Sequence, residues 1–486
     1  MKSVTMKILA LLLATMMILP MLVACGDTGE GVGTTGVASE EVTDRESHIE
    51  RKDYDKEFRA LYCSDTYNEG FFFIEEDKIE MGNDLEDKIY ERMLNVEEHL
   101  GVKIVTENGG TYEEYTIPLK NSISSGDDTY HLVMNHSYME VASLITSNYF
   151  RDFNDFDSLK LDADYWNYDV MESLAINDSL YCGYNDFCLA NCYLIGFNKQ
   201  MVLDYASSIG DLYEQVRNKQ WTLDKLIEYS SLVSIDNGDS KWDENDTYGF
   251  ACHAWVPLIS FQHASNIPIV KRDSDGEFYL SPIKDNKDKI VSLDEKLYNF
   301  IQSECTFTWI PDVFPDGNHT QLHLKSNRVM FEIINNYSLI TTKEDDVKVG
   351  VLPYPLWDSN QEKYQTLNWN GVLGIPTTVQ DEDMVGDVIE LLAWYSEPVT
   401  TAFYETLLGA KVADAPEDVE MLQLVWDGQV SDIGLVFSSS SDQMDRILYA
   451  IPHHIAIGRE AYATYYAKNA RTAEKLLNKM FETKEQ

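Results

Sequence analysis

Basic residues are scarce in this chain. Its 486 residues contain 38 Lys and Arg against 82 Asp and Glu, which gives a formal net charge of -44 at pH 7. Such an acidic surface repels phosphate backbones and anionic lipid headgroups, which argues against nucleic acid as a partner. Charge of this size does not determine the fold. The hydrophobic content of 44% is sufficient for a large core, and the length predicts two or three domains.

Long apolar runs are absent from the sequence except at the N-terminus. Lys2 and Lys7 precede a run of mostly Leu, Met, Ile and Ala that ends at Ala24. A membrane-spanning helix needs about 20 apolar residues, so this run is marginal as a span. A basic start, a short apolar stretch and small residues before a cleavage point are typical of an export signal. We predict a signal peptide over residues 1–24 and a mature chain that works outside the cytoplasm.

Sequence signatures of catalysis are also missing. The chain has no G-x-S-x-G, no H-E-x-x-H and no P-loop lysine pattern. A G-x-G-x-x-G runs from Gly31 to Gly36, but a dinucleotide loop must follow a strand and open a helix. The polar segment around Gly31 does neither. The sequence therefore predicts no cofactor and no enzymatic activity.

Cysteine is sparse, with seven residues in the chain. An exported protein can oxidise its thiols, so both buried free thiols and one local disulfide remain open for the body of the chain. The cysteine spacing does not match the paired C-x-x-C pattern of zinc sites. The cysteines concerned are Cys63, Cys182, Cys188, Cys192, Cys252 and Cys305.

Metal-binding patterns are incomplete as well. Residues 273–277 begin like an EF-hand loop, but Lys284 stands where that loop needs its bidentate Glu, so we predict a hairpin turn. Four aspartates between residues 236 and 246 could gather a calcium ion, although a solvated acidic loop is the usual outcome. His453 and His454 have no companion ligands at metal spacing. We predict no metal site.

The residues that are present follow a regular pattern in the first third of the chain. Strands are predicted at residues 58–63, 102–105 and 130–134, and helices at 84–100 and 112–125, ended by Gly101 and Gly126. This alternation predicts a parallel α/β sheet. Further strands are predicted near residues 180–183, 192–199, 329–334, 347–352 and 367–375, a hairpin at 271–280, and helices at 222–233, 384–395 and from about 441 onward.

The end of the apolar run carries a more specific signal. Leu22-Val23-Ala24-Cys25 resembles the lipobox of bacterial lipoproteins. The resemblance implies cleavage before Cys25 and a lipid on its thiol. Residues 25–55, which we predict as the lipidated cysteine and a flexible stalk, are rich in Gly, Thr, Ser and Glu. We therefore expect an extracytoplasmic body that is lipid-anchored to the cell membrane.

Five stretches in order resemble the family 1 extracellular solute-binding proteins of bacterial ABC importers, the maltose-binding-protein-like group. The resemblance extends from about residue 58 to the C-terminus. The five stretches are residues 88–104, 193–199, 221–225, 350–355 and 426–434, with the sequence Tyr193-Leu194-Ile195-Gly196-Phe197-Asn198-Lys199 in the second and Trp221-Thr222-Leu223-Asp224-Lys225 in the third.

The resemblance implies an α/β, two-lobe periplasmic-binding-protein-like fold of type II, with a ligand cleft between lobes and crossing hinge strands. We expect crossings near residues 186–191, 352–355 and 433–440. Lobe 1 would then comprise residues 56–188 plus 354–435, and lobe 2 residues 191–352 plus 437–486. Two rigid lobes of this kind close on a ligand while the hinge strands absorb the dihedral change.

Loops at the cleft-facing strand ends are the expected places for ligand contacts. Aromatic rings suit the C–H faces of sugars, while amides and carboxylates suit their hydroxyls, and the chain has 29 Tyr and 9 Trp. We expect Trp166, Trp221 and Trp394 to pack in the core. By their approximate match to ligand-contact positions of the family, the predicted ligand-binding residues are Asn135, Tyr138, Asp186, Asn191, Trp255, Tyr337, Trp369 and Asn370.

The function implied by the resemblance is that of a substrate-binding lipoprotein. It would capture a small solute, with a mono- or oligosaccharide favoured, and deliver it to the transmembrane permease subunits of an ABC importer. We expect a monomer. Two alternatives stay open: a receptor for a non-sugar solute, and a surface-anchored glycoside hydrolase whose carboxylate pair is hidden among the 82 acids.

Overall fold

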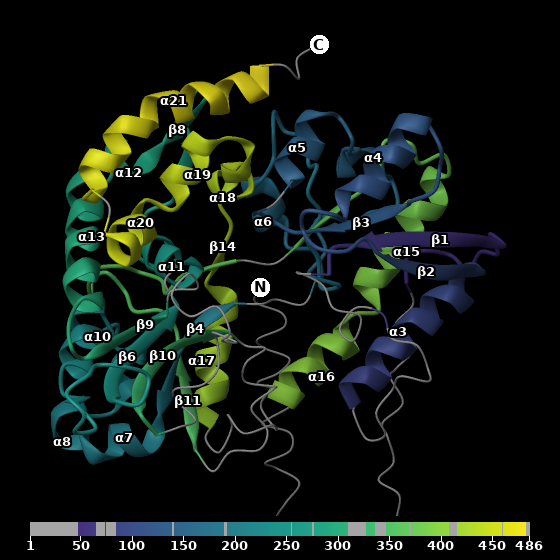
Figure 1. The fold of residues 1–486 in the computed structure, drawn as a ribbon. Helices are drawn as coiled ribbons and strands as arrows, with labels where there is room; N and C mark the ends of the chain where they lie inside the picture. Colours follow the sequence, from purple (N-terminus) through teal and green to yellow (C-terminus); the bar gives the residue numbers. More distant parts are fainter. Residues whose placement is uncertain are drawn as a thin grey trace, which may run out of the picture.

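The computed structural model places two α/β lobes side by side, each built on its own sheet (Figure 1). We call the part around the four-stranded sheet the first lobe and the part around the six-stranded sheet the second lobe. The structure describes residues 47–64, 73, 84–138, 140–188, 192–253, 255–274, 277–309, 327–335, 347–368, 371–407, 416–458 and 460–482.

The sheet of the first lobe has the strand order β13-β3-β1-β2. Strands β1 (Lys56–Tyr62), β2 (Val102–Asn108) and β3 (Leu132–Asn135) are parallel, whereas β13 (Val372–Gly374) runs antiparallel to β3. The predicted parallel α/β arrangement is confirmed. Parallel neighbours need crossover connections, and helices α3 (Asp84–Leu100) and α4 (Thr116–Ser125) supply them.

Helix α3 (Asp84–Leu100) forms as its sequence predicts. Leu85, Ile89 and Val96 recur on one face and are buried. The helix ends at Gly101, whose φ of +60° is a conformation that glycine adopts without strain. Helix α4 (Thr116–Ser125) likewise ends at Gly126 in the left-handed conformation. The other helices of this lobe are α5 (Val141–Thr146), α6 (Tyr168–Ser173), α15 (Glu382–Trp394) and α16 (Glu397–Leu407), with a 3-10 turn at Phe153–Asp155.

The sheet of the second lobe has the strand order β11-β4-β10-β6-β5, with β9 also paired to β6. Strand β4 lies antiparallel to both β10 and β11, and β6 lies parallel to both β10 and β9. The predictions for residues 192–199, 329–334 and 347–352 are confirmed. The strands are β4 (Tyr193–Asn198), β5 (Ser234–Ile235), β6 (Thr247–His253), β9 (Thr306–Trp309), β10 (Val329–Asn335) and β11 (Val349–Leu352).

Helices cover the second sheet and continue into a C-terminal group. Thr222 caps α10 by accepting a hydrogen bond from the Lys225 amide, as its position predicts. The helices before the C-terminal group are α7 (Lys199–Asp204), α8 (Ala206–Ile209), α9 (Leu212–Arg217), α10 (Leu223–Ser230), α11 (Val256–Ala264), α12 (Ser281–Lys284), α13 (Lys287–Ile301) and α17 (Pro416–Asp427). The C-terminal group comprises α18 (Ile433–Val436), α19 (Asp442–Leu448), α20 (Ala450–Ile457) and α21 (Tyr462–Glu482), with a 3-10 turn at Ser438–Ser440.

The hairpin predicted at residues 271–280 is confirmed. Strands β7 (Val270–Arg272) and β8 (Phe278–Leu280) pair antiparallel, and β8 packs against α21. In the described part of the chain, no group of three or more His, Cys, Asp or Glu side chains is arranged to hold a metal ion.

The prediction of a strand at residues 180–183 is wrong. Gly183 makes a single bridge to Leu373 of β13, and residues 180–182 form no strand. The apolar side chains that suggested a strand are explained by burial, because Leu180 and Cys182 are 2% exposed. An added Cβ at Gly183 would meet the ring of Phe153, so the chain passes too close to that ring for a larger residue.

The segments that join the lobes lie beside one another. Strand β12 (Thr366–Leu367) pairs in parallel with β14 (Gln429–Val430), and Asn368 bridges to Cys192 just before β4. Residues 353–366, which include the crossing expected near 352–355, stay in contact with the second lobe. The Trp221 indole donates to the Pro353 carbonyl and the Thr366 hydroxyl donates to the Tyr193 carbonyl. The chain then enters the first lobe at β13.

Two of the three tryptophans expected in the core are fully packed. Trp221 is 0% exposed, and Trp166 is 5% exposed with its indole donating to Glu390. Trp394 is partly buried and packs against the ring of Tyr165. Six cysteines of the body are buried and are not joined in disulfides: Cys63, Cys182, Cys188, Cys192, Cys252 and Cys305. Among the described helices, none combines the length and the apolar character that a membrane crossing requires.

Candidate functional site

A group of aromatic side chains joins the two lobes at the ends of their sheets. Tyr138 follows β3 of the first lobe, and Trp255 lies between β6 and α11 of the second. Tyr449 lies between α19 and α20, and His453 is on α20. We call Tyr138, Trp255, Tyr449 and His453 the aromatic cluster.

The rings of the aromatic cluster meet mostly edge to face. The Tyr449 ring centroid lies 5.9 Å from that of Tyr138 and 5.7 Å from that of Trp255. Trp255 also lies 5.7 Å from His453, at an interplanar angle of 86°. The chain of rings continues into the first lobe through His136, which is 6.3 Å from Tyr138. Contacts at these separations link β3, β6 and the C-terminal helices into one aromatic surface.

Polar groups border these rings. The Tyr138 hydroxyl donates to Asp445 Oδ1 over 2.6 Å, which connects the first lobe to α19. Burial raises the pKa of Asp445, although the Tyr138 hydrogen bond opposes this shift. His453 Nδ1 lies 2.8 Å from the Tyr465 hydroxyl on α21. Burial also raises the pKa of the Tyr138 and Tyr449 hydroxyls, so both phenols are protonated and able to donate at neutral pH.

This arrangement suits a ligand with both apolar and hydroxylated faces. Indole and phenol rings cover C–H surfaces, while the carboxylate of Asp445 and the phenolic hydroxyls can exchange hydrogen bonds with hydroxyl groups. Because the contributing segments come from both lobes, a ligand held by the cluster would contact both lobes. Such binding needs only contact surface and hydrogen bonds, and not the nucleophile–base pair of a catalytic site. The cluster is therefore a surface suited to ligand recognition.

The predicted site residues are distributed unevenly over the structure. Tyr138 and Trp255 are brought together in the aromatic cluster. Asn135 is 0% exposed, and its amide donates to the Val133 and Val372 carbonyls, so it holds β3 to β13. Five predicted positions lie outside the described residues: Cys25, Asn191, Tyr337, Trp369 and Asn370.

Tyr449, His453 and Asp445 were missed by the sequence reasoning, which treated the C-terminal region as structural helix. A signal was available, because Tyr449 and His453 are four residues apart and therefore share one face of a helical segment. Asp445 precedes Tyr449 by the same interval. That this face points toward β3 depends on the return of the chain to the lobe junction, which local spacing does not encode.

Asp186 does not belong to the aromatic cluster. It lies in a turn of the first lobe, where its backbone amide donates to the Tyr165 carbonyl. Burial raises the pKa of its carboxyl group to about 7, and the negative charges of Glu397 and Asp164 add to the shift. The folded state therefore binds a proton at Asp186 more tightly than the unfolded chain, whose aspartates titrate near 3.9.

This shift predicts a pH-dependent stability. Between about pH 4 and 7 the folded chain retains a proton at Asp186 that the unfolded chain has lost, so stability falls as pH rises through this window and levels off above it. The variant Asp186→Asn should lack this component and gain stability relative to the natural chain as pH increases. Urea unfolding of both at pH 4.5, 6 and 8 measures the effect. If the free energies of unfolding of the two proteins differ by the same amount at all three pH values, this prediction is contradicted.

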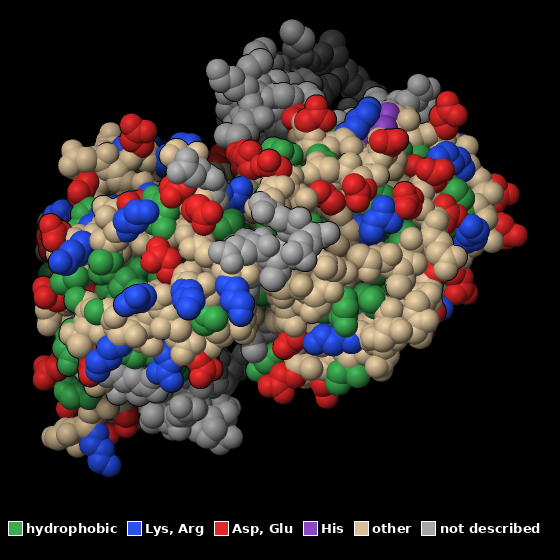
Figure 2. Space-filling view, turned by 90° about the horizontal axis from the view of Figure 1, so that it is seen from above, with side chains coloured by type: hydrophobic (Ala, Val, Ile, Leu, Met, Phe, Trp, Pro, Cys, Tyr) green, Lys and Arg blue, Asp and Glu red, His purple; other side chains and the backbone are tan. Residues whose placement is uncertain are grey.

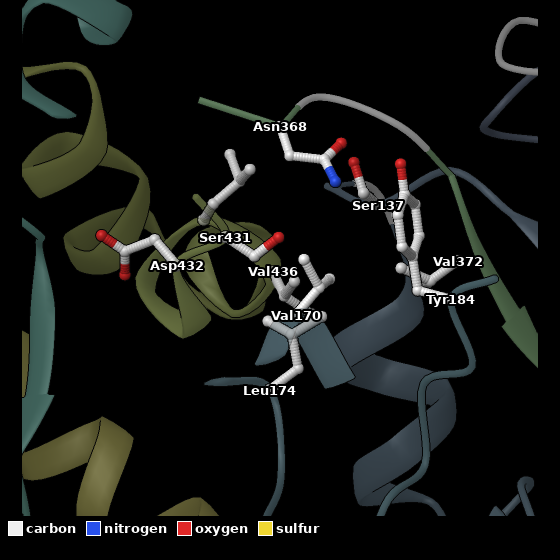
Figure 3. Close-up of a pocket in the computed structure, with 10 residues that line it drawn as sticks. Ser137, Val170, Leu174, Tyr184, Asn368, Val372, Ser431, Asp432 and Val436 are labelled. Carbon is white, nitrogen blue, oxygen red and sulfur yellow. The ribbon is translucent and has the colours of Figure 1, made fainter. Parts of the chain in front are cut away.

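A small cavity lies where the joining segments meet (Figure 3). Its volume is about 10 Å³, which is room for about one water molecule. Ser137 and Tyr184 line it from the first lobe, while Asn368 lies at the end of β12 and Ser431 follows β14. The Ser137 hydroxyl is buried and has no hydrogen-bond partner within the described structure. The cavity therefore belongs to the hinge and is too small for an organic ligand.

The surface around the lobes carries charges of both signs. Figure 2 shows acidic and basic side chains interspersed over both lobes on the upper face of the molecule. Helix α21 places Lys468, Arg471, Lys475 and Lys479 at exposed positions in a chain with a net charge of -44. The Lys468 ammonium pairs with Glu460, and such exposed pairs contribute little to stability.

Solved structures of solute-binding proteins share this fold. The GacH receptor of Streptomyces glaucescens, solved unliganded and with acarbose, matches over 87% of this chain and 98% of its own, with a TM-score of 0.57 and 13% identity. An ABC substrate-binding protein of Listeria monocytogenes, solved with cycloalternan, covers 87% and 99%, with a TM-score of 0.58 and 12% identity.

MalE of Bdellovibrio bacteriovorus, bound to maltotriose, also matches, with a TM-score of 0.55, 13% identity, and coverage of 87% of this chain and 99% of its own. No protein-family model matches the chain, and no curated protein does so by sequence. The predicted two-lobe, periplasmic-binding-protein-like α/β fold is confirmed, because the matches span nearly the whole length of these proteins.

Proposed function

We propose that this chain is a lipid-anchored solute-binding protein of an ABC importer, in the family 1, maltose-binding-protein-like group. It captures a mono- or oligosaccharide outside the cell and delivers it, as a monomer, to the transmembrane permease subunits. The observation that carries the proposal is the aromatic cluster, since it combines rings and hydrogen-bonding groups from both lobes. Three other proteins with this fold were solved with acarbose, cycloalternan and maltotriose bound, which supports the proposal.

The domain boundaries form part of this proposal. Residues 1–24 are the signal peptide and 25–55 the lipidated cysteine and stalk. The lobes follow the predicted division, 56–188 plus 354–435 and 191–352 plus 437–486, with two changes. Residues 353–366 are better placed with the second lobe, because Pro353 and Thr366 are hydrogen-bonded to Trp221 and Tyr193. Helix α17 is better placed with the second lobe, because it packs against β11 and its Asp418 accepts from the Lys199 ammonium over 2.6 Å.

The test is a ligand screen on the body without its stalk. Purified protein is incubated with a panel of mono- and oligosaccharides, and unfolding is followed by thermal shift. A sugar present at 100 times its Kd should add about 2.7 kcal/mol of stability. Stoichiometric binding without product supports the receptor, whereas cleavage of the sugar would support the glycoside hydrolase alternative. A panel of amino acids and peptides run in parallel identifies a non-sugar ligand.

The anchor gives a second prediction. Cys25→Ala should abolish lipidation, so the protein is either released into the medium or left unprocessed at the membrane. Cell fractionation and the mass of the released chain distinguish these outcomes. Cys63→Ala is a suitable control, because Cys63 is buried in the first lobe and should leave the location unchanged. A processed Cys25→Ala protein that stays membrane-bound would disprove the lipid anchor.

A further inference from the structure

A groove separates α6 of the first lobe from the β7–β8 hairpin of the second. Its volume is about 310 Å³, and it is open to solvent on one side. Asp169 and Glu172 of α6 form one wall, and Lys271, Arg272 and Phe278 of the hairpin form the other. The two walls therefore carry opposite charges and belong to different lobes.

Arg272 spans this groove. Its guanidinium Nη2 donates to the carbonyl of Ala175, the second residue after α6. The guanidinium also lies over the Phe278 ring, 4.9 Å from the centroid. Burial lowers the pKa of Arg272, while the negative charges of Asp178 and Glu172 in the first lobe oppose this shift. The cation is thus held by its own hairpin and attracted by the other lobe.

Each end of this contact is fixed to its own lobe. On the first lobe, Asn167 at the start of α6 donates its amide to the Tyr184 carbonyl, and the adjacent Trp166 indole donates to Glu390 of α15. On the second lobe, β8 packs against α21, where the Tyr466 hydroxyl donates to the Leu280 carbonyl. A relative motion of the lobes that widens the groove must therefore break the bond between Arg272 and Ala175.

Lys271 provides a contrast within the same strand. Its ammonium pairs with Asp285 at 3.1 Å, and both residues belong to the second lobe. The neighbouring cation therefore does not tie the lobes together, although it lines the same groove.

We propose that Arg272 is a latch between the lobes, which stabilises the closed arrangement and slows ligand release; its effect on a ligand rests on the proposed function. A hydrogen bond from a charged donor contributes enough to change a two-state population about tenfold. A latch of this strength shifts the balance between open and closed lobes without contacting the ligand.

The first experiment needs no ligand. Solution scattering and hydrogen exchange are compared for the natural body, Arg272→Ala and the matched control Lys271→Ala. Arg272→Ala should have a larger radius of gyration, and amides in residues 168–180 should exchange about tenfold faster. Lys271→Ala should match the natural chain in both measurements. Equal radii and equal exchange in all three proteins would overturn the latch.

A charge swap tests the latch independently, in case Arg272→Ala folds poorly. Arg272→Glu should repel Glu172 and open the lobes, and the double variant with Glu172→Arg should restore the smaller radius. Failure of the double variant to close, with normal unfolding, would also overturn the proposal. Because scattering is measured without ligand, a failed sugar screen leaves this test intact. Conversely, if maltotriose binds but its dissociation rate is the same in Arg272→Ala, the receptor function stands and the latch does not.

Discussion

Replacing Trp255 by alanine is expected to weaken binding of the sugar identified by the screen by about fivefold to a hundredfold, or about 1–3 kcal/mol. Trp255 is partly exposed, and its ring joins Tyr449 and His453 at the junction of the lobes. An indole has two side-chain torsions, so it offers a large contact area for a small entropy loss on binding. Calorimetry measures the affinity, and urea unfolding of the same variant measures its stability.

Trp242→Ala is the matched control for Trp255→Ala. Trp242 is 42% exposed and packs against Tyr248 in the second lobe, outside the aromatic cluster. Its removal should leave the affinity unchanged. If Trp255→Ala instead costs about 3–5 kcal/mol of stability with unchanged affinity, Trp255 is a core residue and does not belong to the site.

Replacing Asp432 by alanine is expected to destabilise the protein by about 3–5 kcal/mol. Asp432 is 3% exposed, and its carboxylate accepts hydrogen bonds from the backbone amides of Ile269, Val270 and Gly434. Its Oδ2 also lies 2.8 Å from His263 Nε2. Without the carboxylate, three buried amides lose their acceptor, and each unsatisfied group carries a desolvation cost. The midpoint of urea unfolding reports the change.

Asp427→Ala is the appropriate control for this substitution. Asp427 ends α17, is exposed, and accepts a single hydrogen bond from the Gln423 side chain. Surface substitutions of this kind usually change stability by less than about 0.5 kcal/mol. A stability of Asp432→Ala within about 1 kcal/mol of the natural chain would show that these amides find other acceptors.

Asp432 also connects two features of the molecule. It follows β14, one of the segments that join the lobes, and its carboxylate points away from the small hinge cavity (Figure 3). By holding Val270, it fixes the base of the hairpin that carries Arg272. The hinge and the latch are therefore coupled through one buried carboxylate, so Asp432→Ala should loosen the latch as well as the fold.

Local patterns in the sequence were sufficient for many individual elements. The apolar face of Leu85, Ile89 and Val96 predicted α3, and Gly101 predicted its end, because both depend on neighbours a few residues away. Thr222 at the start of α10 is a similar case. The α/β class followed from the order of these elements, and the two-lobe fold followed from the order of five longer stretches.

The composition of the site depended on the tertiary structure. Tyr138 and Trp255 were predicted separately, but both contact Tyr449, and Tyr138 also donates to Asp445. Tyr449 and Asp445 belong to the C-terminal region, about 200 residues further along the chain than Trp255. Asn135 shows the reverse case: its amide and position suggested a ligand contact, and the pairing of β3 with β13 uses that amide within the sheet.

The sequence by itself determined the acidic character, the helix and strand periods and the residue types suited to a sugar, and it predicted an export-type N-terminus, since each is a local or summed property. Only the tertiary structure decided that the chain stays with the second lobe after β11, that residues 180–183 form no strand, and that Arg272 bridges to Ala175. These features depend on contacts between residues far apart in the chain, whose formation balances loop-closure entropy against burial and hydrogen bonding in the folded state.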